Sequence, residues 1–155
     1  SRSVTLHVDL PDTPLPVCGD RMSLRRVLVI LLDNAVKYSP RGGTIRLEIR
    51  KGALATGGAA AGIEVTDTGI GLDPADAKHL FERFYRGTRA RQFAPDGSGL
   101  GLAIARTIVE RHKGTLTLES RGEDSRGDGC RARVVLPLES VREDHHRIGP
   151  TAAVV

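Results

Sequence analysis

The chain alternates between two kinds of pattern, and their order restricts the folds open to it. Apolar residues at every second position predict strands over residues 4–10, 44–50, 62–66, 115–119 and 130–136. Helical spacing predicts helices over residues 21–38 and 100–112, and Asp73-Pro74 is a typical start for a further helix between them. This order places helices on one face of a mostly antiparallel sheet. We therefore expect an α+β two-layer sandwich and not a doubly wound parallel sheet.

Capping and turn residues predict where these elements end. Asp20 is a good N-cap for the first helix, and Gly114 is expected to take the left-handed position after the last one. Residues 52–61 are rich in Gly and Ala and predict a loose hairpin loop. Residues 86–98 are rich in Arg and Gly, have little periodicity and predict a mobile surface loop.

The length of 155 residues fits one domain, which we place at residues 1–138, followed by a disordered tail at residues 139–155. No apolar run reaches membrane-spanning length, so we expect a cytoplasmic domain without direct membrane contact.

A net charge of +4 with only 3% aromatics does not favour nucleic acid as a partner. Cys18 and Cys130 are far apart in sequence and predict reduced thiols instead of a metal or redox site. We expect the isolated domain to be a monomer.

A first polar cluster lies on the predicted helix over residues 21–38. Asn34 and Tyr38 are four residues apart and Lys37 is three from Asn34, so the three side chains share one side of that helix. An Asn carbonyl can bind Mg²⁺, and a Lys one turn further can meet phosphates that share the ion. A plain polar flank of an amphipathic helix remains an alternative for this cluster alone.

A second cluster, Asp67-Thr68-Gly69-Ile70-Gly71, follows directly on an apolar strand. A carboxylate at a strand end can accept a hydrogen bond from an exocyclic amine, which selects adenine over guanine. Glycines beside it let a ring approach the backbone. By itself, the pentapeptide could equally be a tight turn into the next helix.

A third cluster, residues 97–104, places three alternating glycines at the start of a predicted helix. Exposed backbone N–H groups and the positive helix terminus form an anion site suited to polyphosphate. A flexible linker explains it less well, because Gly101 inside the first turn costs roughly 1 kcal/mol relative to Ala. The spacing matches neither the P-loop nor the dinucleotide fingerprint.

Together, four segments resemble the N, G1, F and G2 boxes of the catalytic ATP-binding domain of bacterial sensor histidine kinases. The segments are residues 31–40, 67–71, 81–86 and 97–102, in the family's order. The resemblance implies the Bergerat fold shared with gyrase, Hsp90 and MutL ATPases. In that fold a mixed, mostly antiparallel sheet is backed by about three helices, and ATP lies between the helical layer and a mobile lid. We place the lid at residues 82–96.

The resemblance also implies roles on the phosphate side. Asn34 would hold Mg²⁺, Lys37 would reach the phosphates and Arg86 would neutralise their charge, so these three are the expected catalytic residues. Tyr38 would line the nucleotide.

On the base side, Asp67 would bind the adenine amine, with Gly69 and Gly71 beside the ring. Backbone amides would wrap the phosphates at Gly97, Ser98, Gly99, Leu100, Gly101 and Leu102.

The activity implied is phosphoryl transfer from Mg²⁺·ATP to a histidine on a separate dimerisation domain, and then to a response regulator in two-component signalling. None of the five histidines of the chain has the surroundings of such an acceptor, so we expect it elsewhere in a membrane-anchored parent.

One position departs from the family pattern. Many members carry a second Asn, and the hydrolytic relatives a catalytic Glu, where this chain has Ile30. Ile can neither bind Mg²⁺ nor polarise water, which disfavours direct ATP hydrolysis. It also keeps open a non-catalytic nucleotide sensor, and a serine kinase of the anti-sigma-factor type is a second alternative.

Overall fold

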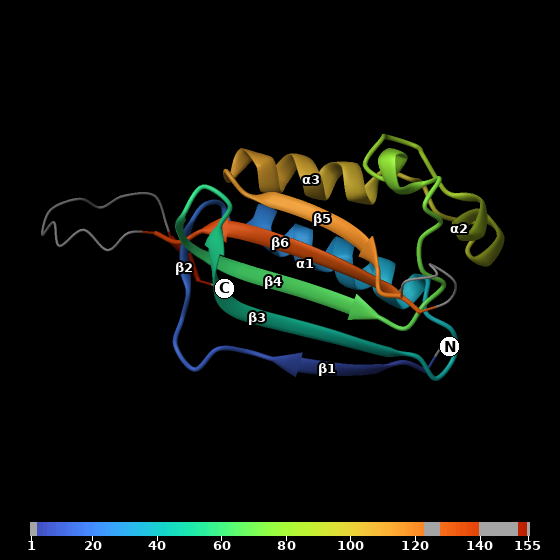
Figure 1. The fold of residues 1–155 in the computed structure, drawn as a ribbon, viewed down its shortest axis with the longest axis horizontal. Helices are drawn as coiled ribbons and strands as arrows, with labels where there is room; N and C mark the ends of the chain where they lie inside the picture. Colours follow the sequence, from blue (N-terminus) through green and yellow to red (C-terminus); the bar gives the residue numbers. More distant parts are fainter. Residues whose placement is uncertain (1–2, 123–127, 140–151, 155) are drawn as a thin grey trace, which may run out of the picture.

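The computed structural model describes residues 3–122, 128–139 and 152–154. Five strands form one sheet in the order β1-β3-β4-β6-β5 (Figure 1). Their bounds are Thr5–Asp9, Thr44–Leu54, Gly58–Asp67, Cys130–Pro137 and Thr115–Ser120 in that spatial order. β1 pairs with β3 in parallel and the other pairs are antiparallel. The predicted mixed sheet of an α+β sandwich is confirmed.

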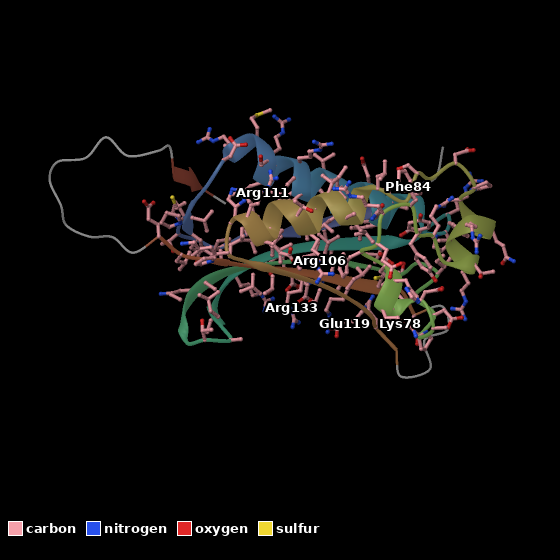
Figure 2. The ribbon with its side chains drawn as sticks, turned by 90° about the horizontal axis from the view of Figure 1, so that it is seen from above. Lys78, Phe84, Arg106, Arg111, Glu119 and Arg133 are labelled. Atoms are coloured by element: carbon pink, nitrogen blue, oxygen red, sulfur yellow. The ribbon has the colours of Figure 1, made fainter. Side chains whose placement is uncertain are left out.

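Two helices, α1 (Arg21–Lys37) and α3 (Gly101–Arg111), lie together on one side of this sheet (Figure 2). α1 begins where predicted, because Oδ2 of Asp20 accepts a hydrogen bond from the backbone N–H of Ser23 at 3.0 Å. Its apolar stripe is buried against the sheet and consists of Leu24, Val27, Leu31 and Ala35.

The sheet has one buried and one charged face, as the period-two patterns predict. The helix-covered face supplies apolar core residues from β3, β4 and β6, which include Ile45, Val65 and Val134. The open face carries ion pairs such as that of Arg133 with Glu64. Residues of α1, β4 and α3 pack together in this core, which fixes the positions of these three elements relative to one another.

Residues 52–61 do not form the loose loop that the composition predicts. β3 continues to Leu54 and β4 begins at Gly58, so the strands meet in a short turn. Alanine supports the ladder there, because Ala60 and Ala61 are fully buried. Because Gly and Ala side chains are small, the alternation of apolar residues does not reveal that both strands extend into this segment.

The segment after Asp73 is also different from the prediction. Oδ1 of Asp73 accepts from the N–H of Ala75 at 3.0 Å, but only a 3₁₀ turn, η1 (Ala77–His79), follows in place of an α-helix. Tertiary contacts override the helix signal, because the N–H of Phe84 donates to Gly99 O at 2.9 Å and the phenolic hydroxyl of Tyr85 donates to Asp76. The predicted loop over residues 86–98 contains a short helix, α2 (Thr88–Phe93).

The left-handed residue after α3 is Lys113, with φ of 59°, and not Gly114 as predicted. Gly114 has another reason to lack a side chain, since a Cβ there would overlap the carbonyl oxygen of Val135.

Two short strands were not predicted, β2 (Pro16–Cys18) and β7 (Ala152–Val154), which pair antiparallel. Most of the tail predicted to be disordered, residues 140–151 and 155, lies outside the described residues. Within the described part of the chain, no helix is long and apolar enough to cross a membrane.

Candidate functional site

A cavity of about 270 Å³ lies where α1, the sheet, η1, α2 and the start of α3 meet. Ten of the residues singled out from the sequence line it: Asn34, Lys37, Tyr38, Asp67, Gly71, Arg86, Ser98, Gly99, Gly101 and Leu102. The folded chain thus brings together three clusters that are separated in sequence. Gly69, Gly97 and Leu100 do not line the cavity.

Asp67, at the end of β4, is the buried carboxylate of this cavity, with 7% of its surface exposed. Its Oδ1 accepts hydrogen bonds from the backbone N–H groups of Gly69 at 2.8 Å and Cys130 at 3.1 Å. No described residue donates to Oδ2. Burial raises the pKa of Asp67, opposed by the two backbone N–H groups and by the charge of Arg121. The carboxylate is therefore held by one oxygen, and its other oxygen can accept a donor from a ligand.

The loop after Asp67 is fastened to the end of α1. The N–H of Ile70 donates to the carbonyl of Tyr38 at 3.2 Å, and Tyr38 caps α1. The N–H of Gly69 donates to the Asp67 side chain and so stabilises this turn. Gly71, which has a φ of 71°, lines the cavity. The last turn of α1 and the carboxylate are thereby fixed relative to each other.

The last turn of α1 supplies the polar side of the cavity. Asn34 is partly buried, and the Nζ of Lys37 lies 5.5 Å from the centroid of the Tyr38 ring. The described residues contain no group of three or more His, Cys, Asp or Glu side chains that could hold a metal. A metal ion here would therefore need oxygen ligands from a bound molecule in addition to the amide of Asn34.

Arg86 is placed differently from the expected phosphate contact. Its guanidinium donates to the carbonyls of Ala90 at 3.1 Å, Pro95 at 3.0 Å and Ala94, and it approaches the hydroxyl of Tyr38 at 3.4 Å. These bonds tie the end of α2 to α1. The Nε of Arg86 is buried without a hydrogen-bond partner, so its N–H can still donate to a ligand.

The glycine-rich segment before α3 leaves its backbone open toward this polar side. A Cβ on Gly97 would overlap Nζ of Lys37 and lie 2.8 Å from Cζ of Arg86. Gly99 has φ of 73°, and a Cβ there would lie 2.8 Å from the carbonyl carbon of Phe84. A side chain at Gly97 would occupy the space beside the two cations, whereas one at Gly99 would overlap the backbone of Phe84 and Tyr85.

Several lining residues were missed by the sequence analysis. Cys130 and Ala132 of β6 and Leu118 of β5 form part of the wall next to Asp67. Their strands were predicted, but the sequence alone does not show that β6 pairs with β4 and β5 with β6. Burial, followed by the charge of Asp67, raises the pKa of the Cys130 thiol, so it is held in the neutral form.

Comparison with known proteins gives a match of residues 19–140 to the model of the "Histidine kinase-, DNA gyrase B-, and HSP90-like ATPase" family. The sensor-like histidine kinase SenX3 of Mycobacterium tuberculosis is 38% identical over 143 residues, which are 91% of this chain and 32% of SenX3. The solved mycobacterial sensor histidine kinase MprB is similar with a TM-score of 0.74 and 32% identity, covering 88% of this chain and 83% of that one. The structure of full-length ShkA in complex with AMPPNP is similar with a TM-score of 0.66 and 28% identity. The match covers 87% of this chain and 26% of ShkA. The chain thus spans about a third of the length of SenX3.

Proposed function

The chain belongs to the family of histidine kinase-, DNA gyrase B- and HSP90-like ATPases, and from this membership we propose that it presents ATP for transfer of the γ-phosphoryl group to a histidine of a separate dimerisation domain. In this proposal the histidine passes the group to an aspartate of a response regulator. The observation that carries it is the convergence of Asp67, the end of α1 and the glycine-rich segment on one cavity.

We propose that Asp67 selects adenine. Its Oδ2 lacks a donor, whereas Oδ1 is occupied by two backbone N–H groups. An exocyclic amine supplies the missing donor, and the apolar wall of Leu118, Ala132 and Val65 suits a flat ring. Gly71 and Tyr38 lie along the same cavity and would contact the nucleoside.

The phosphates would lie against the start of α3. Their charge is met by Lys37, by the buried Nε of Arg86 and by the backbone of residues 97–102. Asn34 would hold Mg²⁺ together with phosphate oxygens, and the ion would neutralise charge on the transferring group. Because this reaction depends on positioning and charge neutralisation, the chain needs no nucleophile of its own.

Residues 82–96 would act as the lid over the nucleotide. Two contacts hold the base of this segment, the hydroxyl of Tyr85 on Asp76 and the backbone bond from Phe84 to Gly99. The carbonyls now bound by Arg86 compete with phosphate for the guanidinium. We propose that ATP draws Arg86 toward the phosphates and rearranges α2.

The parent of this domain is proposed to be a membrane-anchored sensor kinase with this part in the cytoplasm. The support is similarity to sensor kinases, which are about three times longer than the matched segment.

The test is a transfer assay with labelled ATP, this chain and a purified dimerisation domain of the parent. We expect acid-labile, base-stable label on histidine. Label on serine would instead support a kinase of the anti-sigma-factor type. Nucleotide binding without transfer would support a sensor, the alternative that Ile30 favours, because Ile30 lines the cavity and brings no polar atom to it.

A further inference from the structure

The end of the hairpin that joins β5 to β6 lies against the end of β4, where Asp67 stands (Figure 1). The N–H of Arg121, directly after β5, donates to the carbonyl of Gly129 at 3.1 Å, and the hydroxyl of Ser120 donates to the same carbonyl at 3.4 Å. Gly129 is buried, and a Cβ there would overlap the carbonyl oxygen of Asp67. The hairpin end and the end of β4 are therefore in direct contact.

Two donors from this hairpin end bind Asp67. The N–H of Cys130 donates to Oδ1 of the side chain at 3.1 Å, and Nη1 of Arg121 donates to the backbone carbonyl at 3.3 Å. Bonds to both the main chain and the side chain of one residue restrict the orientations that its carboxylate can adopt. The hairpin end thus supports Asp67 from the side opposite to the turn of Gly69.

Arg121 acts from outside the cavity. Asp67 and Cys130 line the cavity, whereas Arg121 and Gly129 do not. The Arg121 side chain is exposed to solvent. A molecule in the cavity would therefore meet Asp67 and not Arg121, so any effect of this arginine on binding passes through Asp67.

Arg121 also brings a positive charge to a carboxylate that burial disfavours. Burial raises the pKa of Asp67, and the N–H groups of Gly69 and Cys130 and the charge of Arg121 oppose this rise. The thiol of Cys130 has a raised pKa and is neutral, so it adds no charge beside Asp67.

The other elements packed around Asp67 bring it no comparable charge. On β3 its neighbour is Ile45, and on β5 and β6 the nearest charged residues, Glu119 and Arg131, pair with each other on the open face. The ionisable groups that share the cavity with Asp67 are Asp33, Lys37 and Tyr38 of α1 and Tyr85 and Arg86 of the proposed lid. Of these groups and Arg121, only Arg121 shifts the pKa of Asp67 through its charge.

We propose that Arg121 is a positioning residue for recognition of the base: its guanidinium holds the end of β4 and favours the charged form of Asp67. A carboxylate offers only acceptors to an exocyclic amine, whereas a protonated carboxyl group can place its own donor against it. The inference rests on the proposed function, in which Asp67 selects adenine. It assigns part of that selection to a residue that never touches the nucleotide.

Three variants separate the charge of Arg121 from its hydrogen bond. Arg121→Gln keeps a donor and removes the charge, Arg121→Lys keeps both, and Arg121→Met removes both. Arg133→Gln is the matched control, because it removes the same charge from the open face, where Arg133 pairs with Glu64. Neither position lines the cavity.

The affinities for ATP and GTP are measured from about pH 8 to about pH 5, with melting temperatures in parallel. Division by the wild-type affinity at each pH removes the titration of the phosphates, which all variants share. Loss of the charge raises the pKa of Asp67 further, so the carboxylate is lost at a higher pH. We expect Arg121→Gln to match wild type near pH 8 and to bind ATP about 1.5-fold to 5-fold more weakly near pH 5, the strength of a charge interaction with an exposed partner.

The other variants complete the expected pattern. Arg121→Lys and Arg133→Gln should follow wild type at every pH. Arg121→Met should show the loss of Arg121→Gln at low pH and a further loss at every pH, which measures the hydrogen bond to the Asp67 carbonyl. The affinity for GTP should change less than that for ATP, because guanine brings no exocyclic amine to the same position.

An Arg121→Gln variant with no loss, or with the same loss at every pH, would overturn the inference while wild-type binding of ATP leaves the proposed function intact. A wild type that binds no ATP would refute the proposed function instead. NMR titration of the Asp67 carboxyl group in the nucleotide-free protein then tests the charge coupling by itself. A higher pKa in Arg121→Gln than in wild type would support the coupling, and equal pKa values would overturn it.

Discussion

Replacing Asp67 by asparagine tests the adenine site with little change to the fold. The amide oxygen of Asn can keep both backbone hydrogen bonds of Oδ1, from Gly69 at 2.8 Å and Cys130 at 3.1 Å. The amide nitrogen then takes the position of Oδ2. An amide nitrogen can only donate, and the amine of adenine also donates, so the two groups cannot form a hydrogen bond. The contact with the base is therefore lost and not merely weakened.

A hydrogen bond to a charged group contributes about 1.5–3 kcal/mol, so ATP affinity should fall about 10-fold to 150-fold in Asp67→Asn. Isothermal titration with ATP and GTP measures this loss, and the preference for ATP over GTP should shrink as well. Glu64→Gln on the open face of the same strand is the control. Unchanged ATP affinity in Asp67→Asn would remove this carboxylate from the binding site.

The same variant should be at least as stable as wild type at neutral pH. Burial raises the pKa of Asp67 in the folded state above its unfolded value. The folded state therefore loses stability as the pH rises through that raised pKa, and Asn removes this cost. Conversely, the affinity of wild type for ATP should fall as the pH drops through the pKa of folded Asp67, which lies above the ordinary value of about 4. Thermal melts that show marked destabilisation of Asp67→Asn would refute this account.

Three further predictions concern the surroundings of the site. Gly129→Ala should lose more than about 1–2 kcal/mol of stability, because φ is +88° and a Cβ would overlap the carbonyl of the buried aspartate; Gly42→Ala, with φ of +80° and open space, should show only the backbone cost in the same denaturant titration. Amide exchange in residues 82–96 should slow with a Mg²⁺·ATP analogue, and identical exchange with and without it would refute the lid. A thiol reagent should modify exposed Cys18 well before Cys130, whose pKa is raised, and mass spectrometry after timed quenching would show the reverse order if this reasoning is wrong.

The sequence predicts the elements whose signals are local. α1 begins at Arg21 because Asp20 caps it, and its buried stripe is visible as helical spacing. β4 ends at Asp67, one residue beyond the end that its alternation predicts. The fold class follows from the order of these elements, since each pattern is repeated over enough residues to dominate its neighbourhood.

The errors lie where long-range contacts override local preference. The helix expected after Asp73 gives way to η1, because Tyr85 is bound to Asp76 and Phe84 to Gly99. The pairing of β2 with β7 joins segments more than a hundred residues apart, and no local pattern predicts it.

For the candidate site, residue types were easier to predict than their partners. Convergence of Asn34, Asp67 and Gly99 on one cavity agrees with the expected neighbourhood. The bonds from Arg86 to the carbonyls of α2 were not foreseeable, because neither α2 nor its orientation is encoded in the spacing of residues 86–98.

The position of a bound Mg²⁺·ATP analogue in a crystal structure of this chain tests the central claim most directly. The account predicts the adenine amine within hydrogen-bond distance of Oδ2 of Asp67 and the phosphates against residues 97–102, near Lys37. A nucleotide bound elsewhere, or one whose base points away from Asp67, would contradict it.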